Sequence, residues 1–251
     1  MEQEINIDCR WSDAVDETFT KDFIFVTNSV FGDVLTPHEF VRQYSDNIYG
    51  RSVIVVVYID GKPSAARALW RNDINGKEAY QPGGTCVLEA CRGKGIFTKM
   101  TKQAIAMLPP TAIIYNFPNY NSFPGYMKMG WTLLHDYKAR LFTSHSVYAK
   151  EHSVKIDAAY ANWWLKGKHL TYAHRGGHYY LLQKDQRRPL CFHILGETSR
   201  EVAEMFPRTR FALLFYKSER YTWYNRRLGA SHVVTRNPEV GYIPTWKIDA
   251  V

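Results

Sequence analysis

A glycine-containing loop between an extended segment and a helical one is the strongest chemical signal in this chain of 251 residues. The loop reads Arg92-Gly93-Lys94-Gly95, and the helical pattern begins at Ile96. The first N–H groups of a helix have no partner within it, and with the helix dipole they favour an anion. Glycines let the backbone approach a pyrophosphate, and Arg92 and Lys94 add positive charge. The pattern predicts a phosphate-binding loop; the alternative is a solvated basic turn that caps a helix.

A second group of candidate residues lies between Asn116 and Trp131, where a short apolar segment gives way to a helical one. It contains Asn119, Ser122 and Tyr126, which carry one amide and two hydroxyls. The dinucleotide fingerprint Gly-x-Gly-x-x-Gly and the triphosphate loop that ends in Gly-Lys-Ser/Thr are both absent. The predicted phosphate therefore belongs to another kind of ligand.

Together the two groups resemble the GNAT family of acyl-CoA-dependent N-acyltransferases. In that family a strand leads into Arg/Gln-x-x-Gly-x-Gly/Ala, which binds the pyrophosphate of coenzyme A, and Arg92 to Ile96 occupy these positions here. Phe97 departs from the pattern, because it stands where the family usually has Gly or Ala. The resemblance covers about residues 20–140. It implies acetyl-CoA, or another acyl-CoA, as the co-substrate.

The resemblance also implies roles for individual residues. Tyr126, Gly130 and Trp131 match the family's Tyr-x-x-x-Gly-aromatic segment, in which the tyrosine gives a proton to the leaving thiolate. A phenol suits this role because it is protonated at neutral pH; the alternative for Tyr126 is a core aromatic near a helix end. The family splays the strand before the loop to admit the pantetheine arm. A backbone N–H of Val87 or Leu88 would then bind the thioester carbonyl.

The general base is less well defined. Glu89 is expected on the strand that leads into the loop, where an ionised carboxylate could take a proton from the incoming ammonium; the alternative is a solvent-facing strand residue. Asn119 and Ser122 stand at the start of the last predicted helix of this region and could bind pantetheine, cap the helix, or do both. The candidate catalytic residues are thus Tyr126 and Glu89, and the candidate cofactor-binding residues are Val87, Leu88, Arg92, Gly93, Lys94, Gly95, Ile96, Phe97, Asn119 and Ser122.

Other reactive side chains indicate no second chemistry. His169, His174 and His178 have no acidic or Cys partner at ligand spacing, so no metal site is expected. Cys86 and Cys91 flank the predicted cofactor strand and are interpreted as small core residues rather than nucleophiles. No Gly-x-Ser-x-Gly elbow occurs, which argues against a serine hydrolase.

The hydrophobic pattern predicts the elements that must hold these residues. In the first half the predicted order is helices near 19–26 and 37–44, strands at 52–59, 63–70 and 85–89, a helix at 97–107, a strand at 112–116, a helix at 124–129 and a strand at 131–137. Hairpin turns are expected at Asp60-Gly61 and Asn75-Gly76, with Gln81 to Gly84 as the approach to the strand at 85–89. This order is typical of a mixed α/β architecture.

The second half repeats part of this order. Strands are predicted at 170–173, 178–183, 190–196, 211–217 and 231–235, and helices at 198–206 and 219–227. From Gly95 to Ala112 the sequence advances by 17 positions and from Gly196 to Phe211 by 15, which indicates a degenerate internal repeat. We therefore expect an α/β, GNAT-like fold with a mainly antiparallel central sheet flanked by helices. Residues 1–145 would form the acyl-CoA-binding catalytic domain, and 146–251 a smaller, degenerate GNAT-like half without the phosphate loop.

The net charge of +8, from 32 Lys+Arg and 24 Asp+Glu, favours an anionic partner. The longest strongly apolar run, Val53 to Ile59, is far shorter than the roughly 20 residues of a membrane-spanning helix. The acidic residues at the start are not typical of a secretory signal, and the four cysteines include no Cys-x-x-Cys. A cytoplasmic location is therefore expected.

The sequence favours transfer of an acetyl group from acetyl-CoA to a primary amine of a small molecule, with an amino sugar as one candidate. The expected partners are acyl-CoA and this amine; nucleic acid is not expected, and a homodimer is left open. Basic and aromatic residues mix from Tyr216 to Arg227 and, with Trp163 and Trp164, are candidates for the acceptor pocket; core packing is the simpler interpretation. The alternative function is a non-catalytic GNAT-fold binding module for nucleic acid or polysaccharide, which Phe97 and the missing second loop would favour.

Overall fold

The computed structural model describes residues 3–74, 76–142, 155–184, 191–209, 213–218 and 230–237. These residues form two compact units. The first extends to Asn116 and also contains Tyr120–Thr132 and Thr235–Asn237, and the second contains Phe117–Asn119 and the described part of 133–234. The predicted boundary between 145 and 146 lies outside the described residues, and so does the predicted helix at 219–227.

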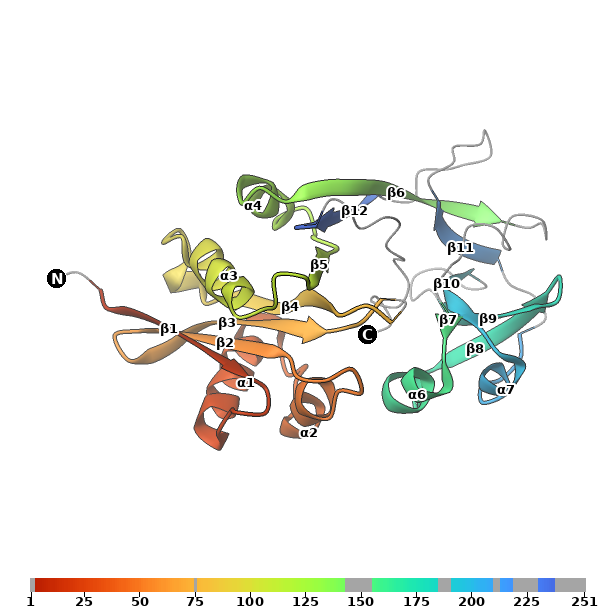
Figure 1. Ribbon diagram of the computed structural model, residues 1–251, viewed down its shortest axis with the longest axis horizontal. Helices are drawn as coiled ribbons and strands as arrows, with labels where there is room; N and C mark the ends of the chain where they lie inside the picture. The colour runs from red at the N-terminus through yellow and green to blue at the C-terminus, as the bar shows by residue number, and fades with distance from the viewer. Residues whose placement is uncertain are drawn as a thin grey trace. The chain divides into compact units, whose positions relative to one another are not determined.

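The first unit is built on five neighbouring strands of the sheet, in the order β1-β2-β3-β4-β5 (Figure 1). Its strands are β1 (Ile5–Trp11), β2 (Val53–Ile59), β3 (Lys62–Arg71), β4 (Ala79–Val87) and β5 (Ile113–Asn116). The first four pair antiparallel in that order, and β5 joins β4 in parallel. The predicted mainly antiparallel sheet is therefore confirmed.

β1 is not among the predicted strands, although it carries a strand pattern. Ile5, Ile7 and Cys9 alternate with polar residues, as on a strand with one covered face. The whole of β1 pairs with β2, from Ile5 opposite Ile59 to Trp11 opposite Val53. β2 is consequently an inner strand, and its first five side chains, all apolar, are buried.

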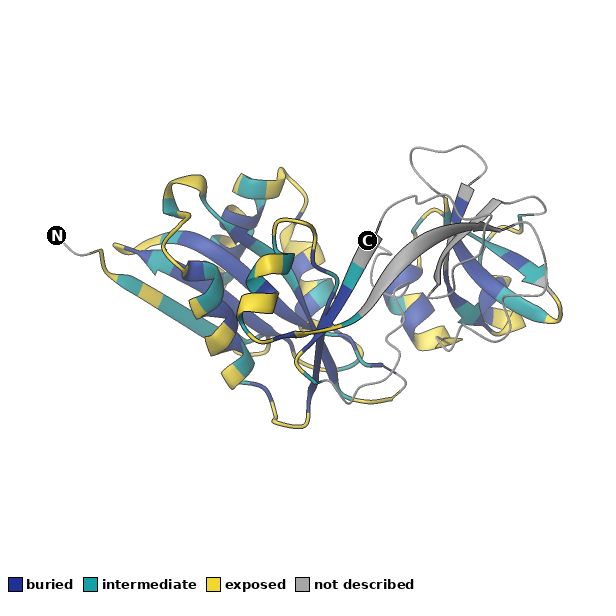
Figure 2. Cartoon of the chain, turned by 90° about the horizontal axis from the view of Figure 1, so that it is seen from above, coloured by how far each residue is buried: buried dark blue, intermediate teal, exposed yellow. Residues whose placement is uncertain are grey.

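Helices cover both faces of this sheet (Figure 1). The helices of this unit are α1 (Glu17–Phe31), α2 (Pro37–Phe40) with its π-helical continuation η1 (Val41–Ser45), the short exposed 3₁₀-helix η2 (Glu89–Cys91), α3 (Ile96–Ala106) and α4 (Phe123–Lys128). α1 and α2 lie on one face and α3 on the other, and the buried residues line the strands and the inner sides of these helices (Figure 2). The predicted start of the second helix is confirmed, because Thr36 forms a capping box with Glu39.

β4 carries a bulge opposite Arg67 of β3. Ala66 faces Cys86 and Ala68 faces Gly83, so two β4 residues lie opposite Arg67 alone. The strand thus includes the Gln81–Gly84 segment that was expected to precede it. Gly84 has a φ of +55°, and a Cβ there would lie 3.5 Å from Phe23 Cζ and from Tyr44 Oη. The bulge therefore requires glycine at this position.

We expect Gly84→Ala to destabilise the protein by about 1–2 kcal/mol, because a side chain would be forced into the left-handed region of backbone conformation. Gly83→Ala is the matched control, since Gly83 has an ordinary φ and nothing lies within 4 Å of the added Cβ. Thermal unfolding of the two variants measures the difference. Equal midpoints would show that the bulge does not depend on Gly84.

The second unit contains the other described strands and helices. Its elements are β6 (Thr132–Phe142), β7 (Lys155–Ile156), α6 (Ala158–Tyr160), the π-helix η3 (Ala161–Leu165), β8 (Leu170–Arg175), β9 (His178–Lys184), β10 (Cys191–Thr198), α7 (Arg200–Ala203), β11 (Leu213–Ser218) and β12 (Ala230–Thr235). β8, β9 and β10 pair antiparallel, and β11 joins β10 in parallel. In neither unit does a described helix have the length and apolar character needed to cross a bilayer.

The pairing order of the second unit repeats part of that of the first. β8, β9, β10 and β11 pair as β2, β3, β4 and β5 do: three antiparallel strands are followed by a parallel one, and a short helix that runs into a π-helix precedes them. The remaining strands differ, because β1 pairs antiparallel with β2 whereas β7 pairs in parallel with β10. The predicted helix at 198–206 is shorter than expected: α7 begins at Arg200, and Ser199 caps it directly after β10. The loop between β4 and α3 therefore has no counterpart between β10 and α7.

Candidate functional site

The predicted glycine loop joins η2 to α3. Gly93 and Gly95 have φ values of +80° and +71°, and no atom lies within 4 Å of a Cβ placed on either. Gly95 is the N-cap of α3, and no side chain caps this helix. Among the described residues, no backbone carbonyl accepts a hydrogen bond from the N–H groups of Gly93 to Thr98. These donors are available to an anion, which is the property that a phosphate-binding loop requires.

The two basic residues of the loop lie on the surface. Arg92 Nε donates to the carbonyl of Val87 at the end of β4 (3.2 Å). Lys94 Nζ donates to the side-chain oxygen of Gln3. Both contacts are exposed single hydrogen bonds to neutral acceptors, which an anionic ligand can replace.

β4 and β5 separate after a short ladder. In the described part of the chain they pair only at Ala79 with Ile113 and at Tyr80 with Ile114. From Gln81 onward, none of the described strands pairs with β4 on this side. The strand that precedes the loop is therefore splayed from its neighbour, as the resemblance predicts.

The two N–H groups that were expected to bind the carbonyl point in different directions. The N–H of Leu88 donates to the carbonyl of Ser64 on β3 (2.9 Å), so Leu88 does not offer a free donor and the expectation for it is wrong. Because successive N–H groups of a strand point to opposite sides, the N–H of Val87 points away from β3, toward the splay. Glu89 is also displaced from its expected position, since β4 ends at Val87 and Glu89 begins the exposed 3₁₀-helix η2.

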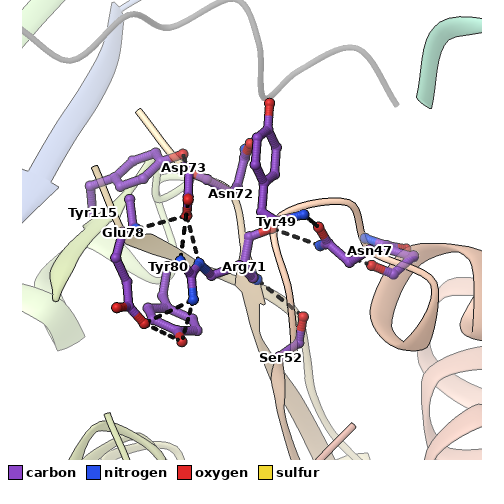
Figure 3. A network of polar contacts seen from close by, with 11 residues as sticks. Asn47, Tyr49, Ser52, Arg71, Asn72, Asp73, Glu78, Tyr80 and Tyr115 are labelled. Atoms are coloured by element: carbon purple, nitrogen blue, oxygen red, sulfur yellow. Dashed lines mark hydrogen bonds and ion pairs between the residues drawn. The ribbon is translucent and has the colours of Figure 1, made fainter. Parts of the chain in front are cut away.

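A polar network that sequence reasoning missed joins the strands at the other end of β4 (Figure 3). Arg71 of β3 forms ion pairs with Asp73 (2.6 Å) and Glu78 (2.9 Å), and the carboxylate of Asp73 also accepts from the N–H of Ala79. Tyr80 Oη donates to Glu78 (2.8 Å); burial, with this contact, raises the pKa of Tyr80 to about 12. The network fixes β4 where it still pairs with β5.

The side chain of Tyr126 is buried on the α3 side of the sheet, with 1% of its surface exposed. Its ring packs edge-on against Trp131, with centroids 4.7 Å apart, and against Phe97, with centroids 5.5 Å apart. Its hydroxyl accepts a hydrogen bond from Arg67 Nη2. The ring of Tyr126 is thus part of the core, and its hydroxyl contacts a buried cation. Arg67 was missed by sequence reasoning, although it is a lone basic residue in an apolar strand pattern.

Phe97, the departure from the family pattern, packs against α4. Its ring lies over Gly125: a Cβ built on Gly125 would be 2.8 Å from Phe97 Cε1. The ring thus occupies the space of the side chain that Gly125 lacks. The first turn of α3 keeps its open N–H groups, including that of Phe97 itself.

We expect Gly125→Ala to destabilise the protein by about 1–3 kcal/mol, because the new methyl group overlaps the Phe97 ring. In a Phe97→Ala background the same substitution should cost little, since the ring is gone. A thermal-unfolding cycle of the two single variants and the double variant measures this coupling. Additive effects would contradict a direct contact between Phe97 and Gly125 as the cause.

Asn119 and Ser122 lie on the segment that precedes α4. Ser122 is the N-cap residue of α4, but its side chain makes no cap bond; its carbonyl accepts from the N–H groups of Gly125 and Tyr126. Asn119 is exposed and belongs to the short segment that groups with the second unit. The structure therefore brings Ser122, but not Asn119, into the unit that carries the loop.

The side chains that were set aside have structural partners. Cys86 is buried, and burial raises the pKa of its thiol to about 11, so it is protonated at neutral pH. His178 Nδ1 contacts Glu197 Oε1 (2.7 Å), an acidic partner that spacing did not reveal, and His174 stacks on Tyr179. Within the described ranges, no cluster of three or more His, Cys, Asp or Glu side chains could hold a metal ion.

Comparisons with known proteins identify the fold. Neither a family model nor a curated protein matches the sequence. Two solved structures match over most of the chain: a GCN5-related N-acetyltransferase from Kribbella flavida (14% identity, TM-score 0.53, covering 91% of this chain and 71% of that one) and a conserved protein of unknown function from Enterococcus faecalis, called a probable N-acyltransferase (11% identity, TM-score 0.52, covering 93% and 72%). The chain therefore has the GNAT fold, as the resemblance predicts.

Proposed function

We propose that this protein is an acyl-CoA-dependent N-acyltransferase that moves an acetyl group from acetyl-CoA to a primary amine of a small molecule. The observation that carries the proposal is the run of open N–H groups from Gly93 to Thr98, at the end of a strand that has separated from its neighbour. A pyrophosphate fits these donors, because the two glycines leave the surrounding space open and Arg92 and Lys94 supply charge.

The bound thioester supplies an activated acyl carbon, and the protein's residues supply the rest. The N–H of Val87 would donate to the carbonyl oxygen as it becomes negative. Tyr126 would give its phenolic proton to the departing thiolate, because its oxygen already accepts from Arg67 and its own hydrogen is left for donation. Glu89 is exposed beside the loop and is the candidate that would take the proton of the incoming amine, directly or through water.

We assign the catalytic role to residues 1–145 and regard 146–251 as a degenerate second copy. The assignment is supported by the direct β10–Ser199–α7 connection, which offers no glycine loop. An amino sugar is the acceptor we favour among small amines, on the aromatic content of the chain. Of the proposed acceptor residues, Trp164 is buried within the second unit and Trp163 packs beside it, with ring centroids 5.3 Å apart.

Calorimetric titration with acetyl-CoA tests the loop. We expect binding to the wild type and a loss of at least about tenfold, or roughly 1.4 kcal/mol, in Gly95→Asp, because the carboxylate would stand among the donors. Gly76→Asp is the matched control: Gly76 has a similar φ of +76° and equally open surroundings, but lies in the turn between β3 and β4.

Absence of acetyl-CoA binding to the wild type would contradict the enzyme function. In that case, an affinity for nucleic acid that falls steeply with salt concentration would support the alternative function, a non-catalytic binding module. The net charge of +8 is the observation that suggests this alternative. Equal weakening by Gly95→Asp and Gly76→Asp would mean that backbone strain, rather than the loop, controls binding.

A further inference from the structure

Arg67 is a buried cation that has no carboxylate partner in the described part of the chain. Its exposed fraction is 0%, and none of the described acidic side chains forms an ion pair with it. Nη1 donates to Thr101 Oγ1 and Nη2 donates to Tyr126 Oη, whereas Nε has no hydrogen-bond partner. The guanidinium also lies 5.1 Å from the ring centroid of Phe97 and 5.5 Å from that of Tyr126.

This arrangement is costly for a residue with only a packing role. Transfer of a charged group from water into the protein interior is unfavourable unless the charge is paired, and two neutral hydroxyls with two aromatic faces offset only part of that cost. The neighbours of Arg67 along β3, Ala65, Ala66 and Ala68, are small and apolar. The strand therefore has no general need for a long cationic side chain at this position.

Each contact of Arg67 fixes one end of the guanidinium. Thr101 Oγ1 accepts from Nη1 and itself donates to the carbonyl of Phe97 in the first turn of α3. The other end holds Tyr126 of α4. Arg67 therefore connects the helix that carries the phosphate-binding turn with the residue proposed as proton donor.

We propose that Arg67 is a positioning residue of the acyl transfer, which directs the phenolic hydrogen of Tyr126 and stabilises the phenolate left when that proton is given away; the inference rests on the proposed function. As the amine nitrogen bonds to the acyl carbon, the carbon–sulfur bond breaks and the thiolate takes the proton of Tyr126. The electron pair of the O–H bond stays on the phenolic oxygen, beside the guanidinium. The proton lost by the acceptor nitrogen later restores the phenol through water.

A double-mutant cycle tests this inference by thiol release from acetyl-CoA in the presence of an amine acceptor. Tyr126→Phe should lower kcat by about 10²-fold, the lower range for loss of a general acid, and Arg67→Met by about tenfold or more. Neither should change KM for acetyl-CoA much. The double variant should be no slower than Tyr126→Phe alone, because Arg67 acts through the Tyr126 hydroxyl.

Thermal unfolding separates this role from a structural one. Arg67→Met should keep the midpoint of the wild type or raise it, because an unpaired buried charge is removed. Arg67→Lys, which keeps the charge, should retain more activity than Arg67→Met. If Arg67→Met fails to fold, the Arg67→Lys and Tyr126→Phe pair provides the same cycle.

Three results would overturn the inference. Wild-type turnover with an unchanged kcat in Arg67→Met, or fully additive losses in the double variant, would remove Arg67 from this role while leaving the proposed function intact. An unchanged kcat in Tyr126→Phe would exclude Tyr126 as the proton donor and, with it, Arg67 as the residue that positions it. Absence of thiol release by the wild type with every amine tested would overturn the proposed function, and the inference with it.

Discussion

The ion pairs of Arg71 hold the first unit's sheet together at the end where β4 and β5 still pair. Arg71 lies on β3, Asp73 binds the N–H of Ala79 at the start of β4, and Tyr115 of β5 donates to the carbonyl of Asn72 (3.1 Å). Three strands are thus tied at one end by contacts that are largely removed from solvent. Beyond this point the bulge opposite Arg67 changes the course of β4, and the β4–β5 ladder ends. The contacts around Arg71 thus lie at the paired end of β4, and the open edge of the strand, which leads to the glycine loop, begins directly after them.

The two arginines of β3 illustrate different uses of one side chain. Arg71 is paired with carboxylates, and those contacts raise its pKa although burial acts in the opposite direction. Arg67, four positions earlier, has only neutral partners and lies in the core beside Tyr126. The first arrangement stabilises the sheet, whereas in the second the neutral partners offset only part of the cost of burying a charge. Partly compensated charges of this kind are expected where a protein needs a charge for its chemistry.

Local features of the chain were predictable, and features that depend on pairing were not. The glycine loop, α3, α4 and the turn at Gly130 follow from residue type and helical periodicity, which act within a few positions. The length of β4 was misjudged because Gln81-Pro82-Gly83-Gly84 is typical of a turn, while pairing with β3 keeps it extended. For the same reason Glu89 was placed on a strand that ends before it, and the donor of Leu88 was thought to be free. A contact such as Arg67 to Tyr126 joins residues 59 positions apart, and no local pattern reports it.

Comparison of the two units shows that the pairing order of the strands does not by itself produce the glycine loop. β2 to β5 and β8 to β11 pair in the same order, yet of the two corresponding connections in the described residues, β4–α3 has a loop with positive-φ glycines and β10–α7 does not. We therefore propose above all that this loop binds acyl-CoA, and amide hydrogen exchange of the wild type with and without coenzyme A tests this binding most directly. Coenzyme A should slow exchange in the peptide that covers Arg92 to Thr98 more than in the β10–α7 segment. Unchanged exchange in that peptide at saturating coenzyme A would contradict the claim.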